Sequence, residues 1–154
     1  MEQNFEAILS STQQCYVMID YYNQQNPIGK LFHESYGIAE FCSLTTLIRL
    51  IEKITGEENN NARQFIPFSD MPDEVIFVHD DLNTNQKYGN LATFRISVLF
   101  TQRNSWQGII SWVEENKAQC FRSVYELIRL IDNAVSYTKY NREASRKQIS
   151  ETGD

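Results

Sequence analysis

One eleven-residue segment occurs twice in this chain, 80 positions apart. Residues 41–51 read FCSLTTLIRLI and residues 121–131 read FRSVYELIRLI, so seven of the eleven positions are identical. In both segments a serine precedes apolar residues that recur with helical spacing. The repeat predicts a duplicated structural unit whose two copies share a core, because one unit of about 45 residues would bury too little surface to be stable alone.

The residues around the second segment predict a β-hairpin followed by a helix. Residues 92–102 (ATFRISVLFTQ) alternate apolar and polar side chains, and residues 106–115 (WQGIISWVEE) alternate again. Alternation is typical of half-buried strands, and the polar connection between the two runs is short enough for a hairpin. Ser123 and Glu126 have the spacing of a capping box, which predicts that the helix begins there.

The first copy shows the same order in a weaker pattern. Strands are expected at residues 15–22 and 28–35, and Ser43 is the expected N-cap of a helix that stops at Gly56. The predicted fold class is therefore α+β: a duplicated ββα unit with a mainly antiparallel sheet and two helices packed on one face.

The chain divides into four parts. Residues 1–56 hold the first copy with an N-terminal extension, and residues 93–137 hold the second copy. Residues 57–92 are acidic and rich in Asn, so we expect a connecting loop with one short strand (EVIFVHD, residues 74–80) at the sheet edge. Residues 138–154 lack apolar periodicity and are expected to be a polar, disordered tail.

Charge and composition exclude several classes of protein. The net charge is −6, with −8 in residues 1–93 and +2 in residues 94–154, so we expect no basic face and no direct contact with nucleic acid. No apolar run is long enough to span a membrane, and no signal peptide is recognisable, which predicts a cytoplasmic protein without membrane contact. Cys15, Cys42 and Cys120 lack the close spacing of a metal or redox site.

The second copy carries a motif that is similar to a known group of proteins. Residues 94–136 combine a strand, the turn RNSWQG, a second strand with a tryptophan, and a helix that begins FRSVYELI. This order resembles a group of short, uncharacterised proteins from Firmicutes, many from gut clostridia, with an RQNxSWQG-like turn and an FRSxxELI helix. The turn here, TQRNSW, departs from the usual RQNxSW. The resemblance implies no activity.

The turn Arg103–Gly108 is the candidate binding surface. It combines a guanidinium, two amides, a hydroxyl and an indole, which suit recognition of a peptide, a base or a planar ligand. The alternative is structural: tryptophans that cover the sheet and polar residues that form the turn. A cation beside a helix N-terminus opposes the helix dipole, so Arg122 is expected to have an acidic partner or ligand. The candidate binding residues are Arg103, Asn104, Trp106, Gln107, Trp112 and Arg122.

Catalysis is not expected. His79 lies in the run VHDD, but adjacent residues of a strand point to opposite faces, and no second cluster of metal ligands follows. Phosphate-binding glycine motifs and the nucleophile motif GxSxG are absent from the sequence. We therefore predict no enzyme, no catalytic residue, no metal and no cofactor.

Three functions agree with these observations. The first is a non-enzymatic interaction or adaptor module that binds an unidentified protein partner through the Arg103–Gly108 turn and an exposed sheet face or edge, as a monomer or a homodimer. The second is an acidic inhibitor of the mobile-element type that mimics nucleic acid toward a basic host or defence protein. The third is a small-molecule-responsive regulatory protein with a site between its two helices.

Overall fold

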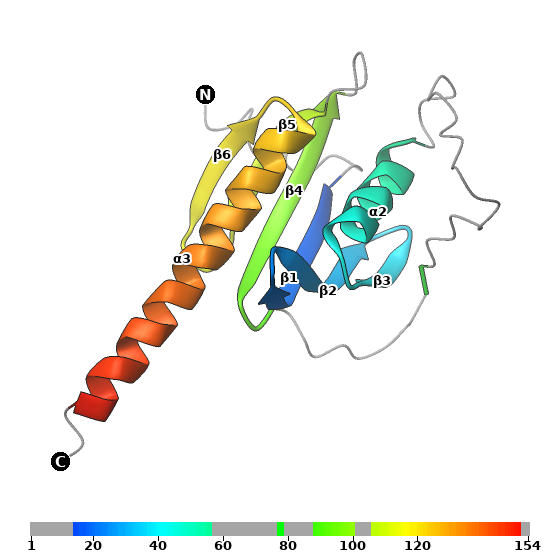
Figure 1. The fold of residues 1–154 in the computed structure, drawn as a ribbon. Helices are drawn as coiled ribbons and strands as arrows, with labels where there is room; N and C mark the ends of the chain where they lie inside the picture. The colour runs from blue at the N-terminus through cyan, green and yellow to red at the C-terminus, as the bar shows by residue number, and fades with distance from the viewer. Residues whose placement is uncertain (1–13, 57–76, 79–87, 101–105, 152–154) are drawn as a thin grey trace.

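A six-stranded antiparallel sheet and two helices form the protein (Figure 1). The computed structural model describes residues 14–56, 77–78, 88–100 and 106–151. The strand order is β3-β2-β1-β4-β5-β6. The elements are β1 (Gln14–Asn23), β2 (Asn26–His33), β3 (Gly37–Phe41), α2 (Leu44–Gly56), β4 (Ala92–Phe100), β5 (Gln107–Trp112), β6 (Lys117–Phe121) and α3 (Val124–Glu151).

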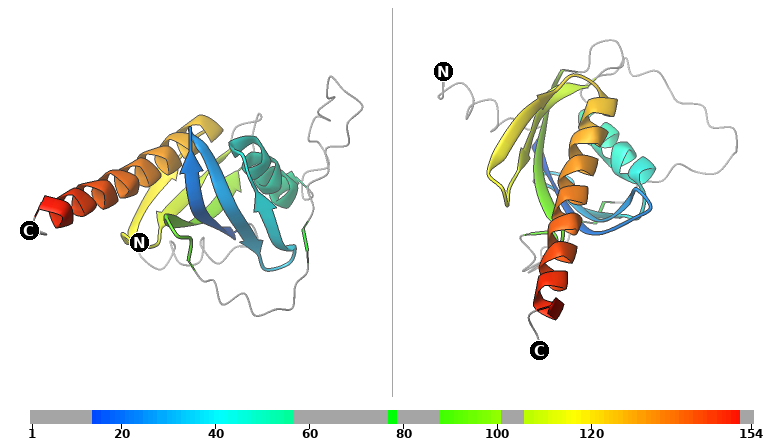
Figure 2. Two further views of the ribbon diagram at one scale, coloured as in Figure 1. Left: turned by 60° about the horizontal axis from the view of Figure 1, so that its bottom comes forward. Right: turned by 60° about the vertical axis from the view of Figure 1, so that its left-hand side comes forward.

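Both helices lie on the same face of the curved sheet (Figure 2), which confirms the predicted α+β class. The alternation seen in the sequence places one face of each central strand against the helices, with Val17 of β1 and Phe94 of β4 fully buried. Leu47 of α2 and Leu127 of α3 complete the same core cluster from the helical side. The two copies therefore share one core, as the repeat predicts.

The copies join where β1 pairs with β4. In this antiparallel pair Val17 lies opposite Phe94 and Cys15 lies opposite Ile96, so apolar side chains of both copies meet on the helix-covered face. Burying this seam stabilises the fold because each fully buried aliphatic or aromatic side chain contributes roughly 1.5–3 kcal/mol.

Each copy is a βββα unit, whereas the sequence predicted ββα. The missed third strands are β3 and β6, which form the two edges of the sheet. Residues 117–120 of β6 are all exposed, so this strand has no apolar alternation to detect. β3 is only five residues long and begins at Gly37, whose φ of 94° favours glycine at the end of a turn.

Both copies contain a β-bulge at the same place. The register shifts between Ile19 and Tyr21 in β1, and between Val98 and Phe100 in β4. A bulge bends its strand and increases the local twist. The paired bulges bend the sheet so that it wraps around the helices (Figure 2).

A glycine on the neighbouring strand faces each bulge. A Cβ on Gly29 would lie 1.9 Å from the carbonyl oxygen of Met18, and a Cβ on Gly108 would lie 2.0 Å from the carbonyl oxygen of Ser97. These clashes are with backbone, which cannot rotate away. The absence of a side chain at Gly29 and Gly108 is therefore a requirement of the duplicated bulge.

Serine caps start both helices, as predicted. The Ser43 hydroxyl accepts a hydrogen bond from the backbone N–H of Thr46 (3.1 Å), and the Ser123 hydroxyl accepts one from the N–H of Glu126 (3.1 Å). The Glu126 carboxylate reaches back to the backbone N–H of Arg122 (2.7 Å), one residue earlier than in a standard capping box.

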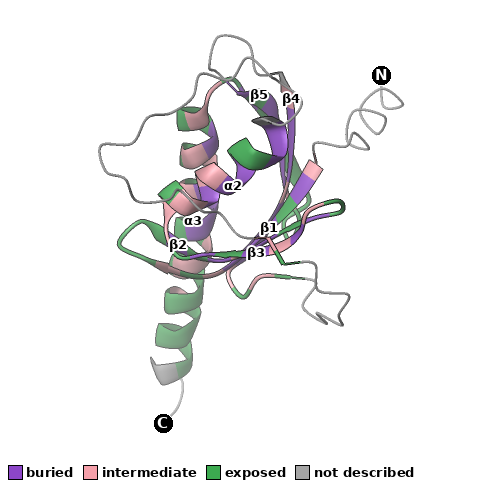
Figure 3. Ribbon diagram, turned by 90° about the vertical axis from the view of Figure 1, so that its right-hand side faces the viewer, coloured by how far each residue is buried: buried purple, intermediate pink, exposed green. Residues whose placement is uncertain are grey.

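The predicted disordered tail is wrong for residues 138–151, which continue α3. The exposed second half of this helix extends beyond the sheet (Figures 1 and 3). Lys139 donates a hydrogen bond to the carbonyl oxygen of Tyr22 (2.8 Å), and Arg142 donates one to that of Asn90 (2.5 Å). The second half of α3 has no apolar stripe. It is stabilised by these two hydrogen bonds and by good helix formers such as Arg, Glu, Ala and Lys.

The connecting segment contributes to one edge of the sheet. Val78 bridges to Ile38 of β3 through two backbone hydrogen bonds of 2.8 and 3.1 Å. This bridge agrees with the short edge strand expected at residues 74–80, and residues 57–76 and 79–87 lie outside the described part of the chain. Neither α2 nor α3 is long and apolar enough to cross a membrane.

We expect Gly29→Ala and Gly108→Ala each to lower the free energy of unfolding by about 2 kcal/mol or more, because the new methyl group forces the bulge apart. Urea denaturation followed by circular dichroism measures this change. Gln107→Ala, at the exposed neighbour of Gly108, should change the value by less than about 0.5 kcal/mol. Normal stability of both glycine variants would show that the bulges can relax.

Candidate functional site

The four predicted binding residues that the structure describes do not all lie on one surface. Arg103 and Asn104 lie outside the described residues. Trp106 is 6% exposed and packs in the core, whereas Gln107, the next residue, is exposed. Trp106 is therefore a core residue, which agrees with the structural alternative for this position. The role predicted for Arg103 and Asn104 stays a prediction.

Arg122 is exposed at the start of α3. Its predicted acidic neighbour exists, but the contact is to the backbone: Glu126 accepts a hydrogen bond from the Arg122 N–H. The same carboxylate lies in the first turn of the helix, where a negative charge is favourable to the helix dipole. Glu126 offsets the unfavourable position of the Arg122 cation.

Trp112 lies in a groove between the edge of the sheet and α3. The groove has a volume of about 320 Å³. Its floor is apolar, and Trp112 packs between Phe94 (ring centroids 6.5 Å apart) and Tyr137 (6.0 Å, rings at 90°). The lining residues are Phe94, Ile110, Trp112, Lys117, Ala118, Gln119, Leu130, Asn133, Ala134 and Tyr137. We call this space the β6–α3 groove.

The indole Nε1 of Trp112 is buried and has no hydrogen-bond partner among the described residues. A buried donor without an acceptor costs about 1–3 kcal/mol. Because the nitrogen itself is buried, a segment that enters the groove would contact the indole ring and not its N–H.

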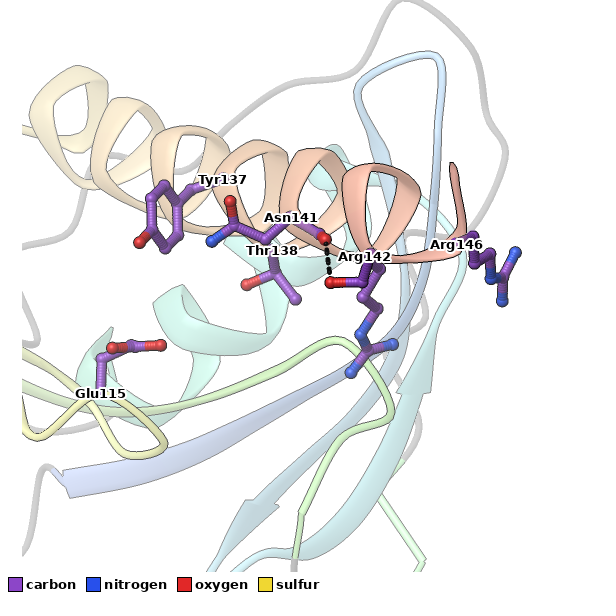
Figure 4. Close-up of a pocket in the computed structure, with 7 residues that line it drawn as sticks. Glu115, Tyr137, Thr138, Asn141, Arg142 and Arg146 are labelled. Carbon is purple, nitrogen blue, oxygen red and sulfur yellow. Dashed lines mark hydrogen bonds between the residues drawn. The ribbon is translucent and has the colours of Figure 1, made fainter. Parts of the chain in front are cut away.

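A second, polar cleft adjoins the groove at Tyr137. Its volume is about 310 Å³, and it lies between the β5–β6 turn and the middle of α3 (Figure 4). The lining residues are Glu115, Tyr137, Thr138, Asn141, Arg142, Ser145 and Arg146. We call it the arginine cleft. The sequence analysis missed this cleft because residues 138–154 were expected to be disordered. The available signal was the spacing of Arg142 and Arg146, since residues four apart share one face of a helix.

Polar contacts near the arginine cleft fix the position of α3 against the first copy. Tyr22 donates a hydrogen bond to the Asp132 carboxylate, and Lys139 donates to the Tyr22 carbonyl oxygen. Burial raises the pKa of Tyr22, and the hydrogen bond to Asp132 and its negative charge raise it further. The phenol therefore stays protonated as a donor well above its usual range.

A third cleft separates the beginnings of the two helices. It has a volume of about 380 Å³ and contains the repeat-related pair Ile48 and Ile128. This is the place where a small-molecule site between the helices was predicted. Its walls are mostly aliphatic, with Arg49 and Glu52 at the polar side.

The described residues contain no cluster of three metal-binding side chains. His33 is buried, and its Nδ1 accepts hydrogen bonds from the backbone N–H groups of Ser35 (3.1 Å) and Tyr36 (3.3 Å). Burial raises the pKa of the Cys15 thiol to about 12, which keeps it protonated at neutral pH and a poor nucleophile. His79 lies outside the part of the chain that the structure describes.

Comparison with protein-family models, curated proteins and solved structures finds no match for this chain.

In the native protein Cys42 and Cys120, both exposed, should react with a thiol reagent at pH 8, and buried Cys15 should not. A titration with Ellman's reagent should therefore count two fast thiols in buffer and three in denaturant. A third fast thiol in buffer would show that the core around β1 opens readily.

Tyr22→Phe should lower the free energy of unfolding by about 1 kcal/mol at pH 7, because the hydrogen bond to Asp132 is lost. The raised pKa stabilises the wild type fully below pH 10, and this contribution disappears as the pH rises further and the unfolded tyrosine ionises. The difference between wild type and variant should therefore shrink above pH 10 in urea titrations. Tyr140→Phe is the control, because this tyrosine is exposed on α3. An unchanged difference across this range would contradict the assignment.

Proposed function

We propose that this protein is a non-enzymatic interaction module that binds an extended segment of another protein as an added strand beside β6. The observation that carries the proposal is a difference between the two sheet edges. Val78 pairs with β3, whereas none of the described residues pairs with the outer side of β6. A sheet edge with unpaired N–H and C=O groups is a template for a further strand.

The repeat itself shows which backbone groups of β6 point outward. Ile38 of β3 and Ala118 of β6 are equivalent, because Phe41 and Phe121 occupy the same register opposite the two glycines. The N–H and C=O of Ile38 point away from the sheet, since both bond to Val78 (3.1 and 2.8 Å). By equivalence the N–H and C=O of Ala118 point outward as well.

The pairing on the far side of β5 leads to the same result. Val113, directly after β5, donates a backbone hydrogen bond to the carbonyl oxygen of Thr93 in β4. Alternate residues of β5, including Trp112, therefore direct their backbone groups toward β6. Trp112 lies opposite Lys117. Lys117 therefore bonds inward, and Ala118 presents its backbone to a partner.

The surroundings of this edge suit specific recognition. In strand addition the backbone hydrogen bonds provide affinity, and pockets beside the edge select side chains. The β6–α3 groove lies beside the open edge, with Lys117 and Gln119 on its rim. The helix of the first copy offers less surface of this kind, since α2 is 13 residues long against 28 in α3.

The proposal keeps the interaction function predicted from the sequence and moves the contact from the Arg103–Gly108 turn to β6 and α3. Buried Trp106 supports this change. Nine of the thirteen acidic residues within 1–93 lie outside the described part, so the nucleic-acid mimic stays a prediction from the sequence.

Selection from a phage-displayed library of random twelve-residue peptides tests the proposal. Wild-type protein should enrich peptides rich in strand-forming residues. The affinity of Ala118→Pro for these peptides should be lower by at least about tenfold, because proline lacks the outward N–H. Proline is tolerated at edge positions that face solvent, so the fold should persist.

Ala118→Ser is the matched control, since it retains the N–H and should bind as the wild type does. Circular dichroism and melting temperature report the fold of all three proteins. Equal enrichment by wild type and Ala118→Pro would refute pairing at β6. Self-association that Ala118→Pro abolishes, measured by analytical ultracentrifugation, would assign the edge to a second copy instead.

A further inference from the structure

Resting on the proposed function, we propose that the strand recognised by β6 carries an apolar side chain followed by an acidic one. The apolar side chain enters the β6–α3 groove between Trp112 and Tyr137. The carboxylate meets Arg142 and Arg146 in the arginine cleft.

The apolar position follows from the walls of the groove. Trp112 and Tyr137 are in edge-to-face contact, with ring centroids 6.0 Å apart, and Phe94 lies behind them. Tyr137 is 52% exposed, so the aromatic surface continues to the groove mouth. Apolar pockets of this kind take aliphatic or aromatic anchors.

The acidic position follows from charge complementarity. The groove and the arginine cleft together present three cations, Lys117, Arg142 and Arg146, against one carboxylate, Glu115. Arg142 uses one nitrogen on the Asn90 carbonyl oxygen and keeps further N–H groups for an anion. The guanidinium group of Arg146 makes no hydrogen bond or ion pair with a described residue. Two guanidinium groups one helical turn apart are suited to a carboxylate.

The topology sets the order of the two side chains. Because α3 follows β6 through a tight turn, it runs back past Gln119 and Lys117, and its later residues lie beyond the start of β6 (Figure 1). A partner strand antiparallel to β6 runs in the same direction as α3. Its acidic residue therefore follows the apolar one.

The spacing also follows from helix and strand geometry. Arg142 and Arg146 lie about 7 to 14 Å beyond Tyr137 along the helix axis at 1.5 Å per residue. An extended strand covers this distance in about two to four residues.

A second copy of the chain does not fit these requirements. β6 has the sequence KAQCF, which contains no acidic residue. In an antiparallel β6–β6 pair the acidic turn residues Glu114 and Glu115 of the second copy precede its Lys117. They would lie beside Phe121 of the first copy, at the end of β6 opposite the arginine cleft.

The test extends the peptide selection with two charge variants. Wild-type protein should enrich peptides with an Asp or Glu two to four residues after an apolar residue, and Arg142→Gln/Arg146→Gln should enrich strand-forming peptides without that preference. Arg129→Gln/Lys147→Gln removes the same charge from residues that do not line the cleft and should keep the preference. Arg146→Gln alone removes no contact with a described residue. It replaces the double variant in the test if the double variant does not fold.

A synthetic peptide with the enriched sequence and its Asn or Gln counterpart make the test quantitative. Fluorescence anisotropy should show about tenfold tighter binding of the acidic peptide to wild type and nearly equal binding of both to Arg142→Gln/Arg146→Gln. Enrichment that Ala118→Pro abolishes but that lacks an acidic preference would overturn this inference and leave the proposed function intact. An acidic preference that survives in the arginine variant would also overturn it. Absence of any enrichment would refute both.

Discussion

The antiparallel pairing of β1 with β4 is the contact on which the rest of the structure depends. Each βββα copy has one apolar sheet face and one helix, which is too little to form a stable core by itself. Pairing the first strands of the two copies sets Val17 beside Phe94 and makes the two apolar faces continuous. Both helices then cover one curved surface, and the paired bulges supply the curvature.

The proposed binding surface arises where the two copies differ. Their third strands are equivalent, yet β3 is paired with Val78 and β6 has an outward-facing backbone at Ala118. Their helices begin with equivalent serine caps, yet α3 is more than twice as long as α2. The additional length supplies Tyr137, Arg142 and Arg146. Duplication thus provides a stable scaffold, and departures from the repeat provide the features suited to a partner.

The two tryptophans show how far pattern alone can locate a site. The alternation in residues 106–115 places Trp106 and Trp112 on one face of the strand, and in the structure both contact the core on the helix-covered face. One is a core residue and the other lines a groove, because core packing closes over Trp106 while the gap between α3 and the sheet edge leaves Trp112 partly open. Alternation reports which face a side chain points to, and it carries no information on what covers that face. For the same reason β6, with its exposed side chains, gave no signal as a strand.

Short-range patterns in the sequence were sufficient to predict the duplicated unit, the alternating strands, the serine caps at Ser43 and Ser123, and the α+β class. These features depend on neighbouring residues, whose contacts are fixed by strand and helix periodicity. Tertiary structure alone decided that residues 138–151 are helical, that Trp106 is buried, and that Val78 pairs with one sheet edge while no described residue pairs with the other. Each of these outcomes depends on groups far apart in the chain, such as Lys139 with Tyr22 and Val78 with Ile38. No local pattern records such distant contacts.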